Sequence, residues 1–382
     1  MDIKICDITL RDGEQAAGVN FYPDEKLAIA EKLVLLNVPI IEAGFAAASP
    51  SDFNAIDLIS REIGLDSNAP IICSMARAKK HDIEVAAEAL SQASNKRIQV
   101  VLSTSDIHLK YKFNIGRNEA REITQEMVEY AASFGCEVEF AAEDATRTDT
   151  DFLIDIFKIA VDAGASIVEI PDTVGYASPA EYGELVSSVC KALPDDIIIS
   201  THCHNDLGLA VANTLAGIAS GAKQAEVTIN GIGERAGNAS LEEVVMNLDT
   251  RKDLYKIDTD IETKHLLSAS QLVSHLSGMS IQKNKAIVGD NAFLHESGIH
   301  QHGMLKNKDT YQIMDPEKIG WAGNQMIIGK HSGKYALLSK LRSMDIELTD
   351  DEFVNFYEKF KRFASKNKII EDGNIQEMAG HN

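Results

Sequence analysis

The chain has 382 residues, more than one typical domain holds. Hydrophobic residues make up 45% and charged residues 25%, which is the balance of a folded globular protein and excludes a disordered one. The formal net charge of -21 argues against nucleic acid as the main partner, because phosphate binding requires a basic surface.

The cysteine pattern and the N-terminus indicate where the protein works. The five cysteines are Cys6, Cys73, Cys136, Cys190 and Cys203, and no two of them form a CxxC pair. Four lie in or beside apolar segments, which favours buried, reduced thiols over disulfides. The N-terminal MDIKICDITL enters a predicted strand directly, with no signal peptide, and no apolar run is long enough to span a bilayer. We therefore expect a cytoplasmic protein without a membrane partner.

Strand-like and helix-like patterns alternate eight times along residues 1–253. The predicted strands are residues 3–9, 39–45, 69–76, 97–103, 137–141, 166–170, 196–200 and 225–229. The predicted helices are residues 23–37, 51–63, 81–93, 118–134, 150–163, 178–192, 205–220 and 240–248. This order predicts an α/β fold, a (β/α)₈ TIM barrel. An open doubly wound sheet is the alternative, but the count of eight and the mostly apolar strands favour the closed barrel.

The pattern changes after the barrel. We expect residues 254–382 to form a small, mostly helical C-terminal region, with helical segments at residues 258–277, 334–342 and 350–366. Residues 283–303 contain three histidines and are predicted to be a loop-rich functional segment. The polar tail that follows the last predicted helix is expected to fray.

Chemically distinctive residues gather at one end of the predicted barrel. The C-terminal ends of the strands carry the active site in barrels of this kind. Residues found just after these ends are Arg11, Asp12, Glu143, Thr173, His202, His204 and Asn238. Residues kept only for structural reasons would not concentrate at the same rim, so we expect them to form one site.

The stretch THCHND, residues 201–206, predicts part of a metal site. Alternate side chains of an extended backbone share a face, so His202 and His204 point the same way. Alone, such a pair is more often one structural and one surface histidine. Asp12 adds a hard oxygen ligand and Asn238 an amide carbonyl. The neighbouring Arg11 can stabilise an oxyanion, or it forms only a surface ion pair in the turn.

Other motifs leave two interpretations each. Glu42 and Glu143 require a partner near the barrel axis, and we expect it to be Arg11 or the metal. Glu139 either faces the barrel interior with Ala141 or faces the helices.

The glycine-rich GIGERAGNAS, residues 231–240, lacks the dinucleotide-binding spacing. It lets backbone approach a phosphate or pantetheine arm, or it is an ordinary loop. HESGIHQHG, residues 295–303, supplies an acid/base histidine or a structural turn.

As a set, these motifs resemble the 2-isopropylmalate synthase branch of the DRE-TIM metallolyases, which also includes homocitrate synthases. The resemblance rests on LRDGEQ, EAGF, EDATRTD, PDTVGYASP, THCHNDLGLAVANT, GIGERAGNASLEEV, HESGIHQHGMLKN, TYQIMDPEKIG and GKHSG. It extends to about residue 341 and so covers nearly the whole chain. It implies a metal-dependent Claisen-type condensation of acetyl-CoA with a 2-oxo acid, followed by thioester hydrolysis.

The resemblance also implies roles for individual residues. The divalent-metal ligands (for Mn²⁺, Mg²⁺ or Zn²⁺) would be Asp12, His202, His204 and Asn238, and the 2-oxo acid would chelate the metal. Arg11 would polarise the keto oxygen, and Glu143, His300 and Tyr311 would form the acid/base set. Substrate contacts would come from Arg11, Gln15, Met75, Lys79, Glu139 and Thr173. Acetyl-CoA would be held at Gly231, Gly233, Arg235 and Gly237.

In the family, the segment carrying His300 and Tyr311 comes from the partner subunit. We therefore expect a homodimer in which residues 254–382 complete the partner's active site. Longer family members continue into a leucine-binding regulatory domain at about the position where this sequence ends, so leucine feedback is not expected.

The expected substrate is 2-oxoisovalerate, which would give 2-isopropylmalate for leucine biosynthesis. Homocitrate synthases resemble this chain in length but carry arginine at the position of Glu139 and histidine at that of Lys79. Homocitrate, citramalate and phosphonomethylmalate synthases remain alternatives. A lyase for 3-hydroxy-3-methylglutaryl-CoA would carry a cysteine within residues 231–240, where this chain has none. A non-catalytic metal- or CoA-binding protein would not need Arg11, Glu143 and His300 together.

Overall fold

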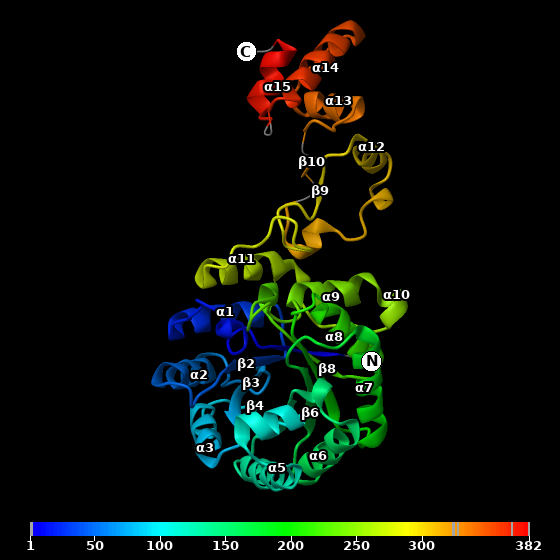
Figure 1. Ribbon diagram of the computed structural model, residues 1–382. Coiled ribbons are helices and arrows are strands. Elements are labelled where there is room, and N and C mark those ends of the chain that lie inside the picture. The colour runs from blue at the N-terminus through cyan, green and yellow to red at the C-terminus, as the bar shows by residue number, and fades with distance from the viewer. Residues whose placement is uncertain (1–2, 323–324, 327, 368–369, 381–382) are drawn as a thin grey trace. The chain divides into compact units, whose positions relative to one another are not determined.

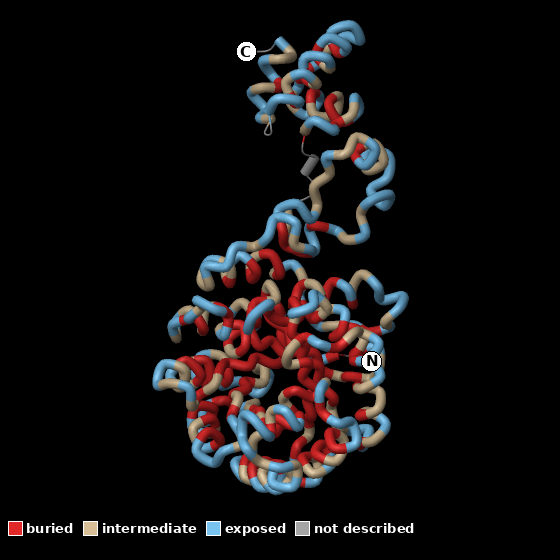
Figure 2. The backbone as a smooth tube through the Cα atoms, viewed as in Figure 1, coloured by how far each residue is buried: buried red, intermediate tan, exposed pale blue. Residues whose placement is uncertain are grey.

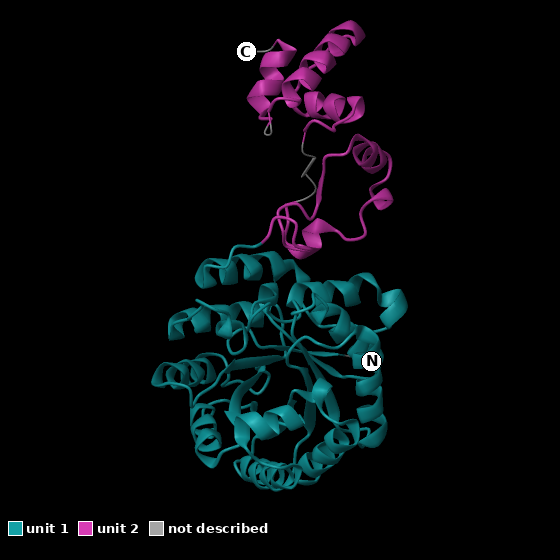
Figure 3. Ribbon diagram, in the orientation of Figure 1, with its two compact units in different colours: residues 1–281 teal, residues 282–382 magenta. Residues whose placement is uncertain are grey.

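The computed structural model describes residues 3–322, 325–326, 328–367 and 370–380. The chain divides into two compact units, Met1–Ile281 and Gln282–Asn382, coloured separately in Figure 3. Each unit is described by itself. No helix among the described residues is long and apolar enough to span a lipid bilayer.

Unit 1 contains a closed barrel of eight parallel strands surrounded by helices (Figure 1). The strands are β1 (Lys4–Asp7), β2 (Ile40–Gly44), β3 (Ile71–Arg77), β4 (Lys96–Ser103), β5 (Glu137–Glu143), β6 (Ile167–Asp172), β7 (Ile198–Cys203) and β8 (Gln224–Val227). Each strand pairs with the next along the chain, and β8 pairs back with β1. The predicted TIM barrel is confirmed.

Seven of the eight helices of the outer layer begin within one residue of their predicted starts, and α8 is the exception. They are α1 (Pro23–Leu35), α2 (Pro50–Glu62), α3 (Lys80–Ala89), α5 (Arg117–Ala132), α6 (Thr150–Asp162), α7 (Pro179–Ala192), α8 (Ala210–Ala219) and α9 (Leu241–Thr250). Helix α7 follows a capping box in which Ser178 and Glu181 bond each other's backbone. Figure 2 shows burial concentrated on the strands and on the helix faces toward them. Strands β2 and β6 are buried at every position, as expected for strands covered on both faces.

The barrel interior has an apolar side and a polar side. On the β1–β3 side, Cys6, Ile8, Ile40 and Cys73 form a buried cluster. On the β4–β8 side the interior residues are polar or charged, and all are at most 2% exposed: Arg97, Gln99, Glu139, Glu169, Gln224 and Glu226. These polar residues alternate with apolar residues that face the helices. The sequences of the strands therefore contain mostly apolar residues.

Strand β7 differs from its predicted bounds of 196–200. It starts at Ile198 and runs to Cys203, so His202 lies within the strand rather than in a loop after it. His204 extends the pairing through an isolated bridge to Asn238. The next backbone N–H, that of Asn205, donates to the carbonyl of Gly237 at 2.8 Å. This bond holds the segment to the β8 loop, and helix α8 therefore begins five residues later than predicted.

Two further differences lie at the edges of the barrel. The connection after β4, for which no element was predicted, forms helix α4 (Asp106–His108) and a π-helical turn, Leu109–Phe113. After β8, helices α10 (Lys252–Tyr255) and α11 (Leu266–Ser277) still belong to unit 1, which extends past the predicted boundary at residue 253. Helix α11 contacts α1 and the short helical turn Ile229–Gly231.

Unit 2 contains a small helical core. Its elements are β9 (Leu294–His295), α12 (Gly298–Lys306), β10 (Gln325–Met326), α13 (Lys334–Ser343), α14 (Asp350–Ala364) and α15 (Asp372–Ala379). Leu337, Phe356 and Phe360 are buried together between the last three helices. The prediction that the tail frays is wrong for α15, because Ile375 joins this core and is 1% exposed.

Candidate active site

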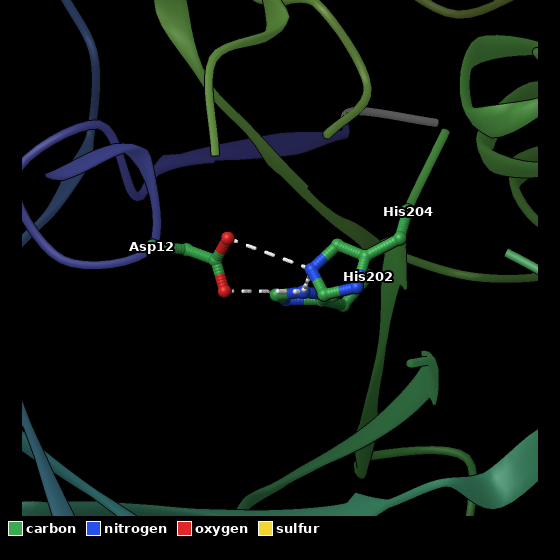
Figure 4. Close-up of side chains that lie close together, drawn as sticks. All are labelled: Asp12, His202 and His204. Carbon is green, nitrogen blue, oxygen red and sulfur yellow. Dashed lines mark hydrogen bonds and ion pairs between the residues drawn. The ribbon is translucent and has the colours of Figure 1, made fainter. Parts of the chain in front are cut away.

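Asp12, His202 and His204 meet at the C-terminal end of the barrel (Figure 4). Asp12 lies in the turn after β1, His202 in β7 and His204 just after it. The Oδ1 atom of Asp12 is 3.5 Å from Nε2 of His204, and its Oδ2 atom is 3.9 Å from Nε2 of His202. All three side chains are buried. A carboxylate and two imidazoles at this spacing can hold one divalent cation.

Hydrogen bonds behind the two histidines orient them for metal binding. Nδ1 of His202 donates to Glu226 at 2.8 Å, and Nδ1 of His204 donates to the backbone carbonyl of Thr173 at 2.6 Å. Nδ1 of His204 also lies 2.9 Å from Nη2 of Arg235, and the two Nε2 atoms lie 3.2 Å apart on the side that faces Asp12. A cation at this point would be within reach of both Nε2 atoms and of the carboxylate. The donor set fits a metal ion, with the second-layer bonds that metal-binding histidines usually have.

The amide oxygen of Asn238 is available to coordinate the same cation. Its Nδ2 donates to Asp12 Oδ1 at 2.7 Å, while its buried Oδ1 has no hydrogen-bond partner among the described residues. A buried carbonyl oxygen without a donor is a candidate metal ligand. The four predicted ligands are therefore together.

The glycines of residues 231–240 shape the loop that carries Asn238. Gly233 has φ +155°, and a Cβ there would lie 2.1 Å from Asn238 Nδ2. A Cβ on Gly237 would lie 1.9 Å from the carbonyl oxygen of Gly231. Any side chain would thus displace the ligand. The role predicted for Gly231, Gly233 and Gly237 in binding acetyl-CoA stays a prediction. Arg235 bonds both carboxylate oxygens of Asp206, at 2.8 and 2.9 Å, and holds the loop against β7.

Arg11 is fixed beside the metal site by two carboxylates. Its Nε donates to Glu42 at 2.7 Å and its Nη1 to Asp12 at 2.8 Å. The predicted Arg11–Glu42 pairing is confirmed. Burial opposes ionisation of Asp12, but Arg11 and the two histidines outweigh it and hold the pKa of this carboxyl well below its usual range. Asp12 is therefore a charged ligand at neutral pH.

Glu143 is held by a cation that sequence reasoning missed. Lys112, in the π-helical turn after β4, places its Nζ 2.8 and 2.6 Å from the two carboxylate oxygens. Ser103 also donates to Glu143. Arg11, one of the two partners expected for Glu143, bonds Glu42 and Asp12 instead, and the expectation of a contact with the metal stays a prediction. Two lysines in a loop after a barrel strand, Lys110 and Lys112, were the available sequence signal.

A cavity of about 480 Å³ joins these groups. Ten of the predicted site residues line it: Arg11, Asp12, Gln15, Met75, Lys79, Glu143, Thr173, His202, His204 and Arg235. Cavity residues absent from the prediction include Gln99, Glu169, Lys112 and Phe113. Thr173 accepts the backbone N–H of Asp144 through Oγ1 at 2.8 Å, which leaves its hydroxyl hydrogen free to donate.

Glu139, His300 and Tyr311 are not among the residues that line this cavity. Glu139 faces the barrel interior, not the helices, but it does not line the cavity. It accepts bonds from Arg97 at 2.8 Å and Gln224 at 2.9 Å. His300 and Tyr311 belong to unit 2, where their rings stack with centroids 4.1 Å apart. Their catalytic role stays a prediction.

Comparison with known protein families agrees with this geometry. A family profile described as HMGL-like matches residues 2–273, and one described as homocitrate synthase post-HMGL domain-like matches residues 287–368. The chain is 48% identical to a 2-isopropylmalate synthase of Pyrococcus furiosus, over 98% of this chain and 74% of the relative. It is 50% identical to a 2-isopropylmalate synthase of Trichormus variabilis, over 98% and 73% respectively.

Solved structures support the barrel alone. An HMG-CoA lyase of Bacillus subtilis matches with TM-score 0.64 and 20% identity, covering 73% of this chain and 95% of that one. The carboxyl transferase domain of a Rhizobium etli pyruvate carboxylase matches with TM-score 0.55 and 15% identity, over 81% and 55%. At these identities the likeness concerns fold and not activity.

Proposed function

The chain belongs to the 2-isopropylmalate synthase family, and on that basis we propose how the residues of the cavity divide the reaction among them. The enzyme is an acyltransferase of leucine biosynthesis that condenses acetyl-CoA with a 2-oxo acid, and the proposed acceptor is 2-oxoisovalerate. It uses a divalent metal ion. The observation that carries the assignment of roles is the meeting of Asp12, His202, His204 and Arg11 in one cavity, with Asn238 bonded to Asp12 behind it.

Asp12, His202, His204 and Asn238 hold the metal ion. When bound, the ion supplies Lewis acidity toward the keto and carboxylate oxygens of the 2-oxo acid. Glu226 and the Thr173 carbonyl contact the Nδ1 atoms of the two imidazoles and so orient both Nε2 atoms toward Asp12.

Arg11 stabilises the negative charge that develops on the keto oxygen. The guanidinium is already anchored at Nε and Nη1, so its position does not change during the reaction. A preorganised donor of this kind lowers the barrier more than a mobile one. The Thr173 hydroxyl donates to the substrate carboxylate, a role that its free hydrogen supports.

Glu143 handles the proton of the acetyl methyl group. Removal of that proton lets the methyl carbon attack the keto carbon, and hydrolysis of the thioester then releases CoA as a free thiol. Lys112 and Ser103 hold the carboxylate in place. His300 and Tyr311 complete the acid/base set from a second copy of the chain. The active form is therefore a homodimer. We expect this enzyme to act in the cytoplasm.

A thiol-release assay tests the function. Acetyl-CoA is supplied with 2-oxoisovalerate, pyruvate, 2-oxoglutarate or phosphonopyruvate, each with Mg²⁺, Mn²⁺ or Zn²⁺ and after chelation. The expected result is metal-dependent thiol release that is fastest with 2-oxoisovalerate, with 2-isopropylmalate identified as the product. Thiol release with none of these acids would refute the function, and a clear preference for another acid would refute the substrate.

A further inference from the structure

Gln99 lies in strand β4, lines the cavity and is 2% exposed. Its Nε2 donates to Glu169 at 2.7 Å and to Glu226 at 3.4 Å. Its Oε1 is buried and has no hydrogen-bond partner among the residues that the structure describes. In this orientation of the amide, both carboxyl groups accept from Nε2 and Oε1 points away from them. An acceptor without a donor is thus left at the wall of the cavity.

Four apolar residues line the cavity together with Gln99. Met75 lies opposite Gln99 on β3, Val101 follows Gln99 on the same face of β4, Ala141 lies opposite Val101 on β5, and Pro171 lies in β6. Low exposure strengthens any hydrogen bond made to Gln99 and penalises leaving its oxygen unpaired. This part of the wall therefore offers apolar contact beside one unpaired acceptor.

We propose that this subsite binds the side chain of the 2-oxo acid and accepts a hydrogen bond from a hydroxyl group on it, with Gln99 as the residue that discriminates. The substrate class is then 2-oxo acids with a neutral, hydroxyl-bearing side chain, in addition to the alkyl acid assigned above. A charged side chain of either sign is disfavoured, because it would meet like charges in a cavity that is lined by cations and carboxyl groups alike, namely Arg11, Arg77, Lys79, Lys112, Asp12, Glu143, Glu169 and Glu234. This inference rests on the proposed function.

The test uses pairs of acids that differ by one methyl-to-hydroxyl exchange. The pairs are 2-oxobutanoate with 3-hydroxypyruvate, and 2-oxopentanoate with 4-hydroxy-2-oxobutanoate. For each pair, the ratio of kcat/KM for the hydroxyl acid to that for the alkyl acid is measured in the wild type and in Gln99→Met. The hydroxyl also changes the reactivity of the keto group, but this effect is the same in both proteins and cancels.

In at least one pair, we expect Gln99→Met to lower the hydroxyl-to-alkyl ratio by about tenfold. Val101→Ala is the matched control, because it enlarges the same subsite without changing a polar group, and it should leave the ratio unchanged. Gln99→Met also removes a donor from Glu169 and Glu226. If that variant does not fold, Gln99→Asn, which retains the amide but shortens it, is measured instead.

The proposal is overturned if the ratio in both pairs is the same in the wild type and the Gln99 variant. It is also overturned if Val101→Ala lowers the ratio as much as the Gln99 variant does. These results differ from failure of the proposed function, in which the wild type releases no thiol with 2-oxoisovalerate or any alkyl acid of the panel.

Discussion

The Nε2 atoms of His202 and His204 lie 3.2 Å apart, and the opposite ring nitrogen of each donates to an oxygen. The same two Nε2 atoms lie 3.9 and 3.5 Å from the carboxylate oxygens of Asp12. Three side chains that can coordinate a cation thus converge on one point, which favours the prediction that a metal ion binds there.

Replacing His204 with alanine should remove one ligand without unfolding the barrel. We expect metal affinity to fall by at least about a hundredfold and turnover to be lost at ordinary metal concentrations. Metal titration by calorimetry and circular dichroism measure the two properties separately. His275→Ala, an exposed change on α11, is the control. Normal turnover of His204→Ala at saturating metal would contradict the ligand assignment.

Replacing Arg11 with lysine keeps the positive charge but removes the several N–H donors of the planar guanidinium. One ammonium cannot reproduce the bonds to Glu42 and Asp12 and also face the keto oxygen. We expect kcat to fall by about 10²–10³ while the KM for acetyl-CoA changes less than about threefold. Steady-state kinetics with each substrate varied give both numbers, and Arg61→Lys on α2 serves as control. A change confined to the KM for acetyl-CoA would rule out this role.

Mixing two inactive variants tests the shared active site. Glu143→Gln alters unit 1 and His300→Ala alters unit 2, and each alone should lose most activity. If unit 2 acts on a second copy, a mixed dimer contains one site with both residues intact. After subunits are exchanged at equal concentrations, we expect about a quarter of wild-type activity to return. No recovery, with subunit exchange shown by mass spectrometry, would mean that each chain completes its own site.

Asp7 should make stability depend on pH. Burial raises the pKa of this carboxyl to about 7, only partly offset by the N–H of Thr9, which bonds Oδ1 at 2.9 Å. Below about pH 4 both folded and unfolded chains are protonated at this site. As the pH rises from about 4 to about 7, the unfolded chain ionises first, so the free energy of unfolding falls.

Asp7→Asn removes the ionisation and keeps the shape. Relative to the wild type, we expect the variant to gain stability with rising pH, by on the order of 2–4 kcal/mol between pH 4 and pH 8. Urea unfolding at several pH values measures the difference. Asp162→Asn, at an exposed position of α6, should show no such trend. A constant difference between Asp7→Asn and wild type across this range would show that Asp7 is ionised in the folded chain.

Most of the fold could be predicted from local pattern. Period-two and period-3.6 spacing, with proline and serine at helix starts, located the eight strands and the outer helices to within a few residues. The rule that barrel chemistry lies at the C-terminal strand ends then brought Asp12, His202, His204 and Asn238 together. The positions of these elements and the grouping of the four residues depend on short-range sequence signals or on the order of strands and helices, and both can be deduced from the sequence.

What the sequence did not predict depends on partners distant along the chain. Glu143 at the end of β5 pairs with Lys112 from the loop after β4. No local sequence pattern in either segment predicts the conformation of this loop. Gln99 and Glu226 are separated by 127 positions and meet only across the closed barrel. The extension of β7 to Cys203 follows from bonds to the β8 loop. Such contacts are set by tertiary closure, not by periodicity.

The division of the barrel interior has a consequence for altering the enzyme. The metal ligands come from the turn after β1, from β7 and from the β8 loop, whereas Met75, Gln99, Val101 and Ala141 come from β3, β4 and β5. The predicted metal ligands and the predicted acceptor subsite thus lie on different strands, and only Glu143 places reaction chemistry on β5. A combinatorial library over Met75, Val101 and Ala141, which have no bond to the predicted metal ligands, should change the choice of 2-oxo acid and retain the condensation.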